Sequence, residues 1–162
     1  MFNPDTAPYS RFLMQTIEAA APSLGVQAIA IPVRATAGIE PALASFARAP
    51  NGGLMLFGDS FVVLRYSLII DLAGRYRLPS ISSEYNFAKA GGLMEYGPTI
   101  DLTGQFRQAA TYVDRILKGA KPSDLPIRGA DRYWFAINLK TAKALGLTIP
   151  ETLLATADEV IQ

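Results

Sequence analysis

The period of hydrophobicity along this chain switches repeatedly between short apolar runs and longer segments with helical spacing. Residues 26–33 (VQAIAIPV) form a nearly continuous apolar run with branched residues, and shorter predicted strands occur at residues 53–58, 78–83 and 92–97. Such runs are typical of strands that are covered on both faces. Helical segments lie between them, at residues 8–21, 39–49, 60–77 and 84–90. Strands that alternate with helices at this spacing predict right-handed crossovers and a parallel sheet, so the predicted fold class is α/β.

The last third of the chain begins with its clearest helix, predicted over residues 101–118. The apolar positions of this segment form one stripe, made of Leu102, Phe106, Ala109, Val113, Ile116 and Leu117. Thr99 or Asp101 can cap its start, and Gly119 can end it. We expect an extended connector next, then a strand at residues 134–139, a short helix at 140–146 and another helix that begins after Pro150.

Composition excludes several kinds of chemistry. The 162 residues fit one domain, and a net charge of +1 without a basic stripe makes nucleic acid a poor partner. The chain has no Cys and no His, so thiol nucleophiles, imidazole bases, disulfides and the usual zinc sites are excluded, and we expect no cofactor and no metal. Its first ten residues lack the basic start and apolar centre of a signal peptide. The most apolar segment carries Arg65 and Asp71 and is too short to span a bilayer.

Polar side chains follow the predicted strands, at residues 3–6, 58–60, 82–85 and 96–99. Because ligands of open parallel sheets bind beyond the carboxyl ends of the strands, we expect these tips to form one binding edge. Asp59 or Glu84 could hold an ammonium group, Ser and Thr could form hydrogen bonds, and Tyr could supply an apolar wall. These groups suit a small zwitterion.

Other interpretations of the same residues remain open. Asp59, Ser60 and Ser83 could be helix caps alone, and the tyrosines could be packing residues. A carboxylate-based enzyme could use Asp59 and Glu84. A signalling receiver domain shares this architecture, but no Lys follows the run at 92–97, where such a domain needs one. An interaction or structural remnant without any ligand is a further alternative.

Two long stretches, EYNFAKAGGLMEYGPTIDLTGQFRQAATYVDRILKGAKPSDLPI and FAINLKTAKALGLTIPETLLATADEVI, carry a family resemblance. The chain resembles the C-terminal half of ABC-transporter substrate-binding proteins of the tryptophan/tyrosine-binding type. The resemblance implies one lobe of a type I periplasmic-binding-protein-like (flavodoxin-like) fold, with residues 1–97 as the second lobe. Residues 98–162 would then be a return segment whose elements pack on a first lobe.

The resemblance also implies a function without bond chemistry, so we do not expect an enzyme. Two lobes close on a small organic solute, such as an amino acid or a related carboxylate, and deliver it to an ABC permease outside the cytoplasm, in the periplasm for this type. Carried over by position, the ligand-binding residues are Asn3, Tyr9, Ser10, Asp59, Ser60 and Glu84. With one lobe absent, this chain alone is expected to bind weakly or not at all.

Met1 and Phe2 fall where the family's first strand of the second lobe ends. Loss of that strand would leave buried backbone groups unpaired. We therefore expect the sheet to be repaired by the strand at RYWFAINL (residues 132–139), either within the chain or in a homodimer formed by strand exchange.

Overall fold

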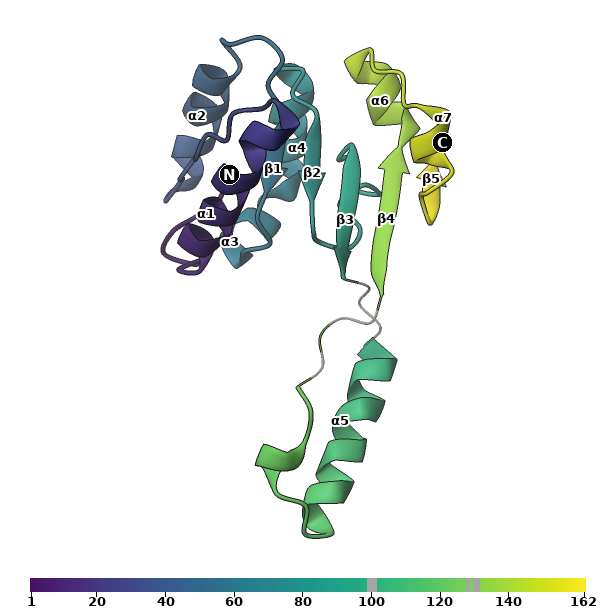
Figure 1. The fold of residues 1–162 in the computed structure, drawn as a ribbon. Helices are drawn as coiled ribbons and strands as arrows, with labels where there is room; N and C mark the ends of the chain where they lie inside the picture. Colours follow the sequence, from purple (N-terminus) through teal and green to yellow (C-terminus); the bar gives the residue numbers. More distant parts are fainter. Residues whose placement is uncertain (99–101, 128, 130–131) are drawn as a thin grey trace.

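The structure, a computed structural model, describes residues 1–98, 102–127, 129 and 132–162. Five strands form one sheet in the order β1-β2-β3-β4-β5 (Figure 1). Their bounds are Leu54–Leu56, Ser80–Ser82, Met94–Pro98, Tyr133–Asn138 and Glu159–Ile161. Neighbouring strands are parallel except for β3 and β4, which are antiparallel. The predicted α/β class with a largely parallel sheet is confirmed.

Helices connect the strands and extend the chain beyond them. Along the sequence they are α1 (Ser10–Ala20), η1 (Ala21–Leu24), η2 (Thr36–Gly38), α2 (Ile39–Phe46), α3 (Ser60–Val63), α4 (Tyr66–Arg75), α5 (Leu102–Leu117), η3 (Pro122–Asp124), α6 (Leu139–Leu145) and α7 (Glu151–Leu154). The helix predicted over 101–118 is confirmed as α5, while its predicted caps, Thr99 and Asp101, lie outside the described residues.

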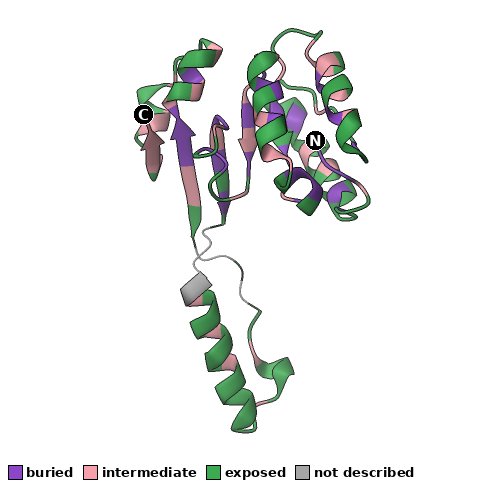
Figure 2. Cartoon of the chain, turned by 180° about the vertical axis from the view of Figure 1, so that it is seen from behind, coloured by how far each residue is buried: buried purple, intermediate pink, exposed green. Residues whose placement is uncertain are grey.

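The core lies between one face of the sheet and helices α2 and α4. Leu54 and Leu56 point to this face and are buried, while Met55 between them points to the other face and is half exposed. They pack in one cluster with Ile39 and Leu43 of α2 and with buried residues of α4. Full burial of such a side chain contributes about 1.5–3 kcal/mol, so this cluster holds the parallel strands in place. Figure 2 shows that burial is concentrated in the sheet and its flanking helices.

Three predicted elements differ from the structure. The predicted strand at residues 26–33 is wrong, since one isolated bridge from Phe2 to Pro32 is what the structure shows there. A strand needs a neighbour along its length, and the described residues pair with this run only at that bridge. The predicted helix over 60–77 breaks at Arg65, whose backbone (φ −121°, ψ 15°) separates α3 from α4. Residues 84–90 form successive turns instead of a short helix.

The C-terminal segment also departs from expectation. After Pro150 the helix α7 lasts one turn, and the chain then adds strand β5 to the sheet beside β4. Strand β4 is paired on both edges within the chain, with β3 and β5. This strand therefore pairs within the chain, at a position away from Met1 and Phe2.

Helix α5 projects away from the sheet (Figure 1). On its apolar stripe, Phe106 is 73% and Leu117 is 81% accessible. The hydroxyl of Tyr112 donates a hydrogen bond of 2.5 Å to the carbonyl of Pro126, which holds the following segment against this helix. The boundary predicted at residue 97 stays a prediction.

Candidate functional site: a polar rim at the carboxyl ends of the strands

The segments that follow Phe2, β1 and β2 meet at one edge of the sheet, because parallel strands end on the same side. Here the backbone N–H of Asn3 donates to Asp59 Oδ2 at 3.1 Å, and Thr6 Oγ1 donates to Asp59 Oδ1 at 3.0 Å. The hydroxyl of Tyr9 donates to the carbonyl of Gly58 at 3.0 Å. The structure thus brings together the first two predicted loops, and Glu84 joins them from the third.

Asp59 is an internal residue of this rim. Its side chain is 2% exposed and accepts a third hydrogen bond from the backbone N–H of Val62 at 3.0 Å, which caps helix α3. The cap of this helix is therefore Asp59 and not Ser60. With three donors on one carboxylate, Asp59 ties the loop after Phe2 to the loop after β1.

Asn3 and Ser10 are also buried. The side-chain oxygen of Asn3 accepts from the N–H of Asp5 at 2.8 Å, and its amide donates to the carbonyl of Arg34 at 3.4 Å. These contacts fix the turn that leads into α1. Asn3 thus shapes the rim from inside, as Asp59 does.

Glu84 lies against Gly58 in the neighbouring loop. A Cβ added to Gly58 would come within 2.0 Å of Glu84 Oε1, so the carboxylate would have to move from its present position. Below it, Tyr66 and Ser82 share a hydrogen bond of 2.7 Å between their hydroxyls, and Ser82 Oγ accepts from the N–H of Glu84 at 3.3 Å. Glu84 is half-buried and is held from below and from one side.

Exposed groups complete the rim. Tyr9, Ser60 and Tyr85 are accessible at its surface. Burial, assisted by the negative charges of Asp59 and Glu84, raises the pKa of Tyr9, so its hydroxyl stays protonated at neutral pH and keeps its hydrogen bond to the carbonyl of Gly58. The ring of Tyr85 packs edge-on against Trp134, with centroids 6.3 Å apart. Trp134 has a buried indole N–H without a partner among the described residues.

Burial and nearby charges also change the pKa of Tyr66, whose hydroxyl lies below the rim. The pKa of Tyr66 is raised, first by burial and further by nearby carboxylates, while its hydrogen bond with Ser82 opposes the shift. Tyr66 is therefore a neutral hydrogen-bonding group here. The rim as a whole offers one half-buried carboxylate, several hydroxyls and an aromatic wall, which suits a small polar molecule carrying a positive group.

The described residues contain no cluster of three or more His, Cys, Asp or Glu side chains that could hold a metal ion. No helix in the described part of the chain is long and apolar enough to cross a membrane.

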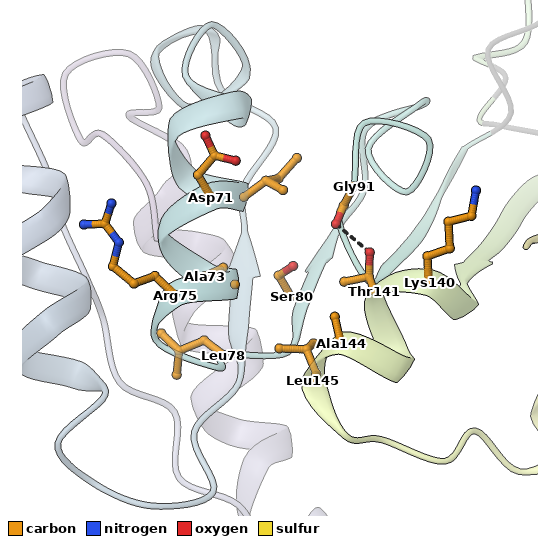
Figure 3. Close-up of a pocket in the computed structure, with 12 residues that line it drawn as sticks. Asp71, Ala73, Arg75, Leu78, Ser80, Gly91, Lys140, Thr141, Ala144 and Leu145 are labelled. Carbon is orange, nitrogen blue, oxygen red and sulfur yellow. Dashed lines mark hydrogen bonds between the residues drawn. The ribbon is translucent and has the colours of Figure 1, made fainter.

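A larger depression of about 410 Å³ lies at the opposite end of the strands, between α4 and α6 (Figure 3). Ile70, Ala73, Leu78, Ala144 and Leu145 give it apolar walls. Two of its polar side chains already have partners within the chain: Thr141 donates a hydrogen bond to the carbonyl of Gly91 at 2.9 Å, and Arg75 forms an ion pair with Glu40 at 2.8 Å. This depression lies far from the convergent loops, so the rim is the better candidate site.

Comparison with known proteins decides the family. The model of a family described as ABC transporter substrate binding protein matches residues 1–161. The chain belongs to this family. No curated protein sequence matches it significantly.

Solved structures of similar fold also match almost the whole of this chain. A conserved domain protein from Vibrio cholerae is 25% identical with a TM-score of 0.81, over 98% of this chain and 52% of its own. An ABC domain from Streptococcus pneumoniae, in complex with L-Trp, is 23% identical with a TM-score of 0.78, over 99% and 55%. A ligand-free, open substrate-binding protein with adhesive properties from Clostridium difficile is 18% identical with a TM-score of 0.68, over 95% and 50%. The chain spans about half the length of each, as the resemblance to a half-length copy predicted.

Sequence reasoning missed several residues of the rim. Thr6 and Gly58 lie in predicted tips of the binding edge but were not among the six predicted ligand-binding residues, and Tyr66 was not predicted at all. Gly58 had a usable signal, since a glycine directly before the capping Asp59 is typical of a close backbone approach. Glu95 was also missed: it is buried, and its carboxylate accepts from the N–H of Ala88 at 2.9 Å.

Proposed function

We propose that this chain is one half of the solute-binding component of an ABC importer, and that its rim contacts the solute. The observation that carries the proposal is the convergence of Tyr9, Ser60 and Glu84 at the carboxyl edge of a chain that belongs to the substrate-binding family. In such proteins two lobes close around the ligand, which is a shift between open and closed populations without any bond chemistry.

The six predicted ligand-binding residues divide into two groups in this proposal. Tyr9, Ser60 and Glu84 contact the solute, because they are accessible or half-buried at the rim. Asn3, Ser10 and Asp59 hold the loops from inside, because they are buried and, for Asn3 and Asp59, fully engaged in hydrogen bonds. Tyr85 would add a wall.

The solute we propose is an amino acid or a related carboxylate. Glu84 supplies the negative charge that selects an ammonium group, and charge-assisted hydrogen bonds of this kind are about twice as strong as neutral ones. The L-Trp bound to the Streptococcus pneumoniae protein makes an aromatic amino acid the first solute to test. The partner would be an ABC permease, and the location extracytoplasmic, by family.

A carboxylate-based enzyme is disfavoured by the state of Asp59. Its carboxylate is 2% exposed and accepts three hydrogen bonds, so it has no free position near Glu84 for acid–base work. A homodimer formed by strand exchange stays a prediction.

The test is an NMR titration of the ¹⁵N-labelled 162-residue chain with L-tryptophan and, as a probe without an ammonium group, N-acetyl-L-tryptophan. If the two-lobed protein binds at about 1 μM, half of the contacts give roughly −4 kcal/mol, or a Kd of about 1 mM. We expect saturable shifts at residues 58–60 and 83–85. L-Tryptophan should bind about tenfold more tightly than the acetylated probe, which is about 1.4 kcal/mol.

Matched variants identify the ammonium partner. Glu84→Gln should remove the preference for L-tryptophan over the acetylated probe, whereas Glu18→Gln, on the exposed side of α1, should leave it unchanged. Absence of shifts at the rim, with saturation elsewhere or nowhere, would contradict the proposed function and favour a remnant without a ligand. Equal effects of the two variants would remove Glu84 from the site.

A further inference from the structure

Trp134 lies at the rim although its strand runs in the opposite direction. Strand β4 is antiparallel to β3, so its first residues lie beside the last residues of β3, and Trp134 pairs with Gly97 (Figure 1). Trp134 lines a narrow crevice together with Glu84 and Tyr85 of the loop after β2 and with Glu95 of β3. The indole therefore shares this crevice with the carboxylate that we propose holds the ammonium group of the solute.

The indole N–H of Trp134 is a buried donor without an acceptor. In the part of the chain that the structure describes, Trp134 Nε1 is the one buried side-chain nitrogen or oxygen that has no hydrogen-bond partner. Nearly all buried polar groups in proteins are paired, either with protein atoms or with ordered water. A phenylalanine would offer a similar ring without the unpaired donor, so the fold itself gives no reason for the N–H.

The groups around this N–H keep the crevice closed. It is too narrow in this structure to hold a water molecule. Gly97 lies so close to the loop after β2 that an added Cβ would come within 2.0 Å of the carbonyl oxygen of Ser83. The ring of Tyr85 packs edge-on against the indole, with centroids 6.3 Å apart, and Tyr85 is 44% exposed. The exposed Tyr85 side chain, rather than the closely packed backbone, is therefore the part that can turn away and admit an acceptor.

The charges of the crevice limit which acceptor can enter. Glu84 and Glu95 both line it, so an anion without a positive group would be repelled. The carboxylate of Glu95 is buried and accepts from the N–H of Ala88 at 2.9 Å, which leaves the half-buried Glu84 to pair with a cation. A molecule with an ammonium group and a carboxylate on the same carbon atom can satisfy Glu84 and the indole N–H together. An α-amino acid has this arrangement.

We propose that Trp134 is a specificity-determining residue, whose indole N–H donates a hydrogen bond to the carboxylate of a bound α-amino acid while Glu84 pairs with its ammonium group. Tyr85 turns away from the indole as the solute enters. This inference rests on the function proposed above and narrows its solute to α-amino acids. Because the N–H is unpaired until the carboxylate arrives, this hydrogen bond is gained in the bound state alone, which favours molecules that carry the carboxylate.

The chain has one tryptophan, so a ¹⁵N-labelled sample gives a single indole N–H signal in its NMR spectrum. Three unlabelled probes are titrated: L-tryptophan, tryptamine, which lacks the carboxylate, and indole-3-propionate, which lacks the ammonium group. L-Tryptophan should move the Trp134 indole proton downfield, because the proton gains a charged acceptor, and should bind about tenfold more tightly than tryptamine. Tryptamine should shift residues 58–60 and 83–85 without moving the indole proton downfield. Indole-3-propionate should not bind at the rim.

A matched pair of variants at neighbouring positions of β4 separates the N–H from the ring. Trp134→Phe removes the donor and keeps an aromatic ring, so it should weaken binding of L-tryptophan about tenfold and leave the Kd of tryptamine within about twofold. Tyr133→Phe is the control, because Tyr133 is 55% exposed and points to the other face of the sheet, and it should change neither Kd. Far-ultraviolet circular dichroism verifies that both variants fold, and the titrations of the unaltered chain do not depend on them.

The outcomes also separate this inference from the proposed function. If L-tryptophan shifts residues 58–60 and 83–85 but leaves the Trp134 indole proton in place, the inference is wrong while the proposed function stands. The same holds if Trp134→Phe weakens binding of L-tryptophan and tryptamine equally, or if indole-3-propionate binds as tightly as L-tryptophan. A downfield move with all three probes would overturn the inference too, because water would then be the acceptor that reaches the N–H. If no probe shifts the rim, both are wrong.

Discussion

Replacing Asp59 by Asn tests whether this carboxylate ties the rim loops together. The Asn carbonyl oxygen can still accept from Thr6 and Val62, but its NH₂ group would face the buried N–H of Asn3, which loses its acceptor. A lost charge-assisted hydrogen bond costs about 1.5–3 kcal/mol, and a buried unsatisfied N–H costs about 1–3 kcal/mol. Because these costs describe partly the same event, we expect a loss of about 2–4 kcal/mol in the free energy of unfolding.

The assay is urea unfolding followed by circular dichroism. With a slope of about 2 kcal/mol per M for a domain of this size, the midpoint for Asp59→Asn should fall by about 1–2 M. Asp71→Asn is the control, because it makes the same chemical change at an exposed position, and it should change the free energy of unfolding by less than about 0.5 kcal/mol. If the two variants unfold at the same urea concentration, Asp59 does not hold the loops as described.

Three more predictions follow from single positions. Gly97→Ala should destabilise the fold by more than about 2 kcal/mol in urea unfolding, because the new Cβ would come within 2.0 Å of the carbonyl oxygen of Ser83. Gly74→Ala is the control: nothing lies near its Cβ, so it should stabilise α4 by about 0.5–1 kcal/mol. In the 162-residue chain prepared with a free Met1 amine, burial lowers the pKa of that amine from 8.0 to about 5. The unfolded state then binds more protons between these values, so the free energy of unfolding should rise by up to about 4 kcal/mol from pH 5 to pH 8. The chain has no His to titrate in this window, so an N-acetylated chain should lack the rise, and a flat profile for the free amine would contradict its burial. Leu117→Ser on α5 should leave the urea midpoint unchanged because the side chain is 81% exposed, and a loss above about 1 kcal/mol would mean that the stripe packs within this chain.

The local pattern of the sequence was sufficient to predict the layers of the fold. The short strand at residues 54–56 and the apolar spacing within 66–75 depend on neighbours close in sequence, so period and polarity predict them. The run at 26–33 has the same local pattern but does not form a strand, because pairing depends on a segment far away in sequence. A strand prediction from periodicity assumes a partner, and among the described residues this run has one only at Pro32.

The rim shows the same division between local and long-range information. Strand order placed Tyr9, Asp59 and Glu84 at one edge, because residues after parallel strands converge. The pattern could not separate Asp59, which is buried under three donors, from Glu84, which is half exposed, since a capping carboxylate and a ligand-binding carboxylate look alike in sequence. Glu95 was missed because its acceptor role depends on the turns at 84–90, which the sequence predicted as a helix.

The central claim is that a solute contacts the rim formed by the loops after Phe2, β1 and β2. Intermolecular nuclear Overhauser effects between the indole protons of L-tryptophan and assigned side chains of the chain measure this contact directly. The account predicts cross-peaks to the rings of Tyr9 and Tyr85. Cross-peaks confined to Leu78, Ala144 and Leu145, in the depression at the other end of the strands, would contradict it.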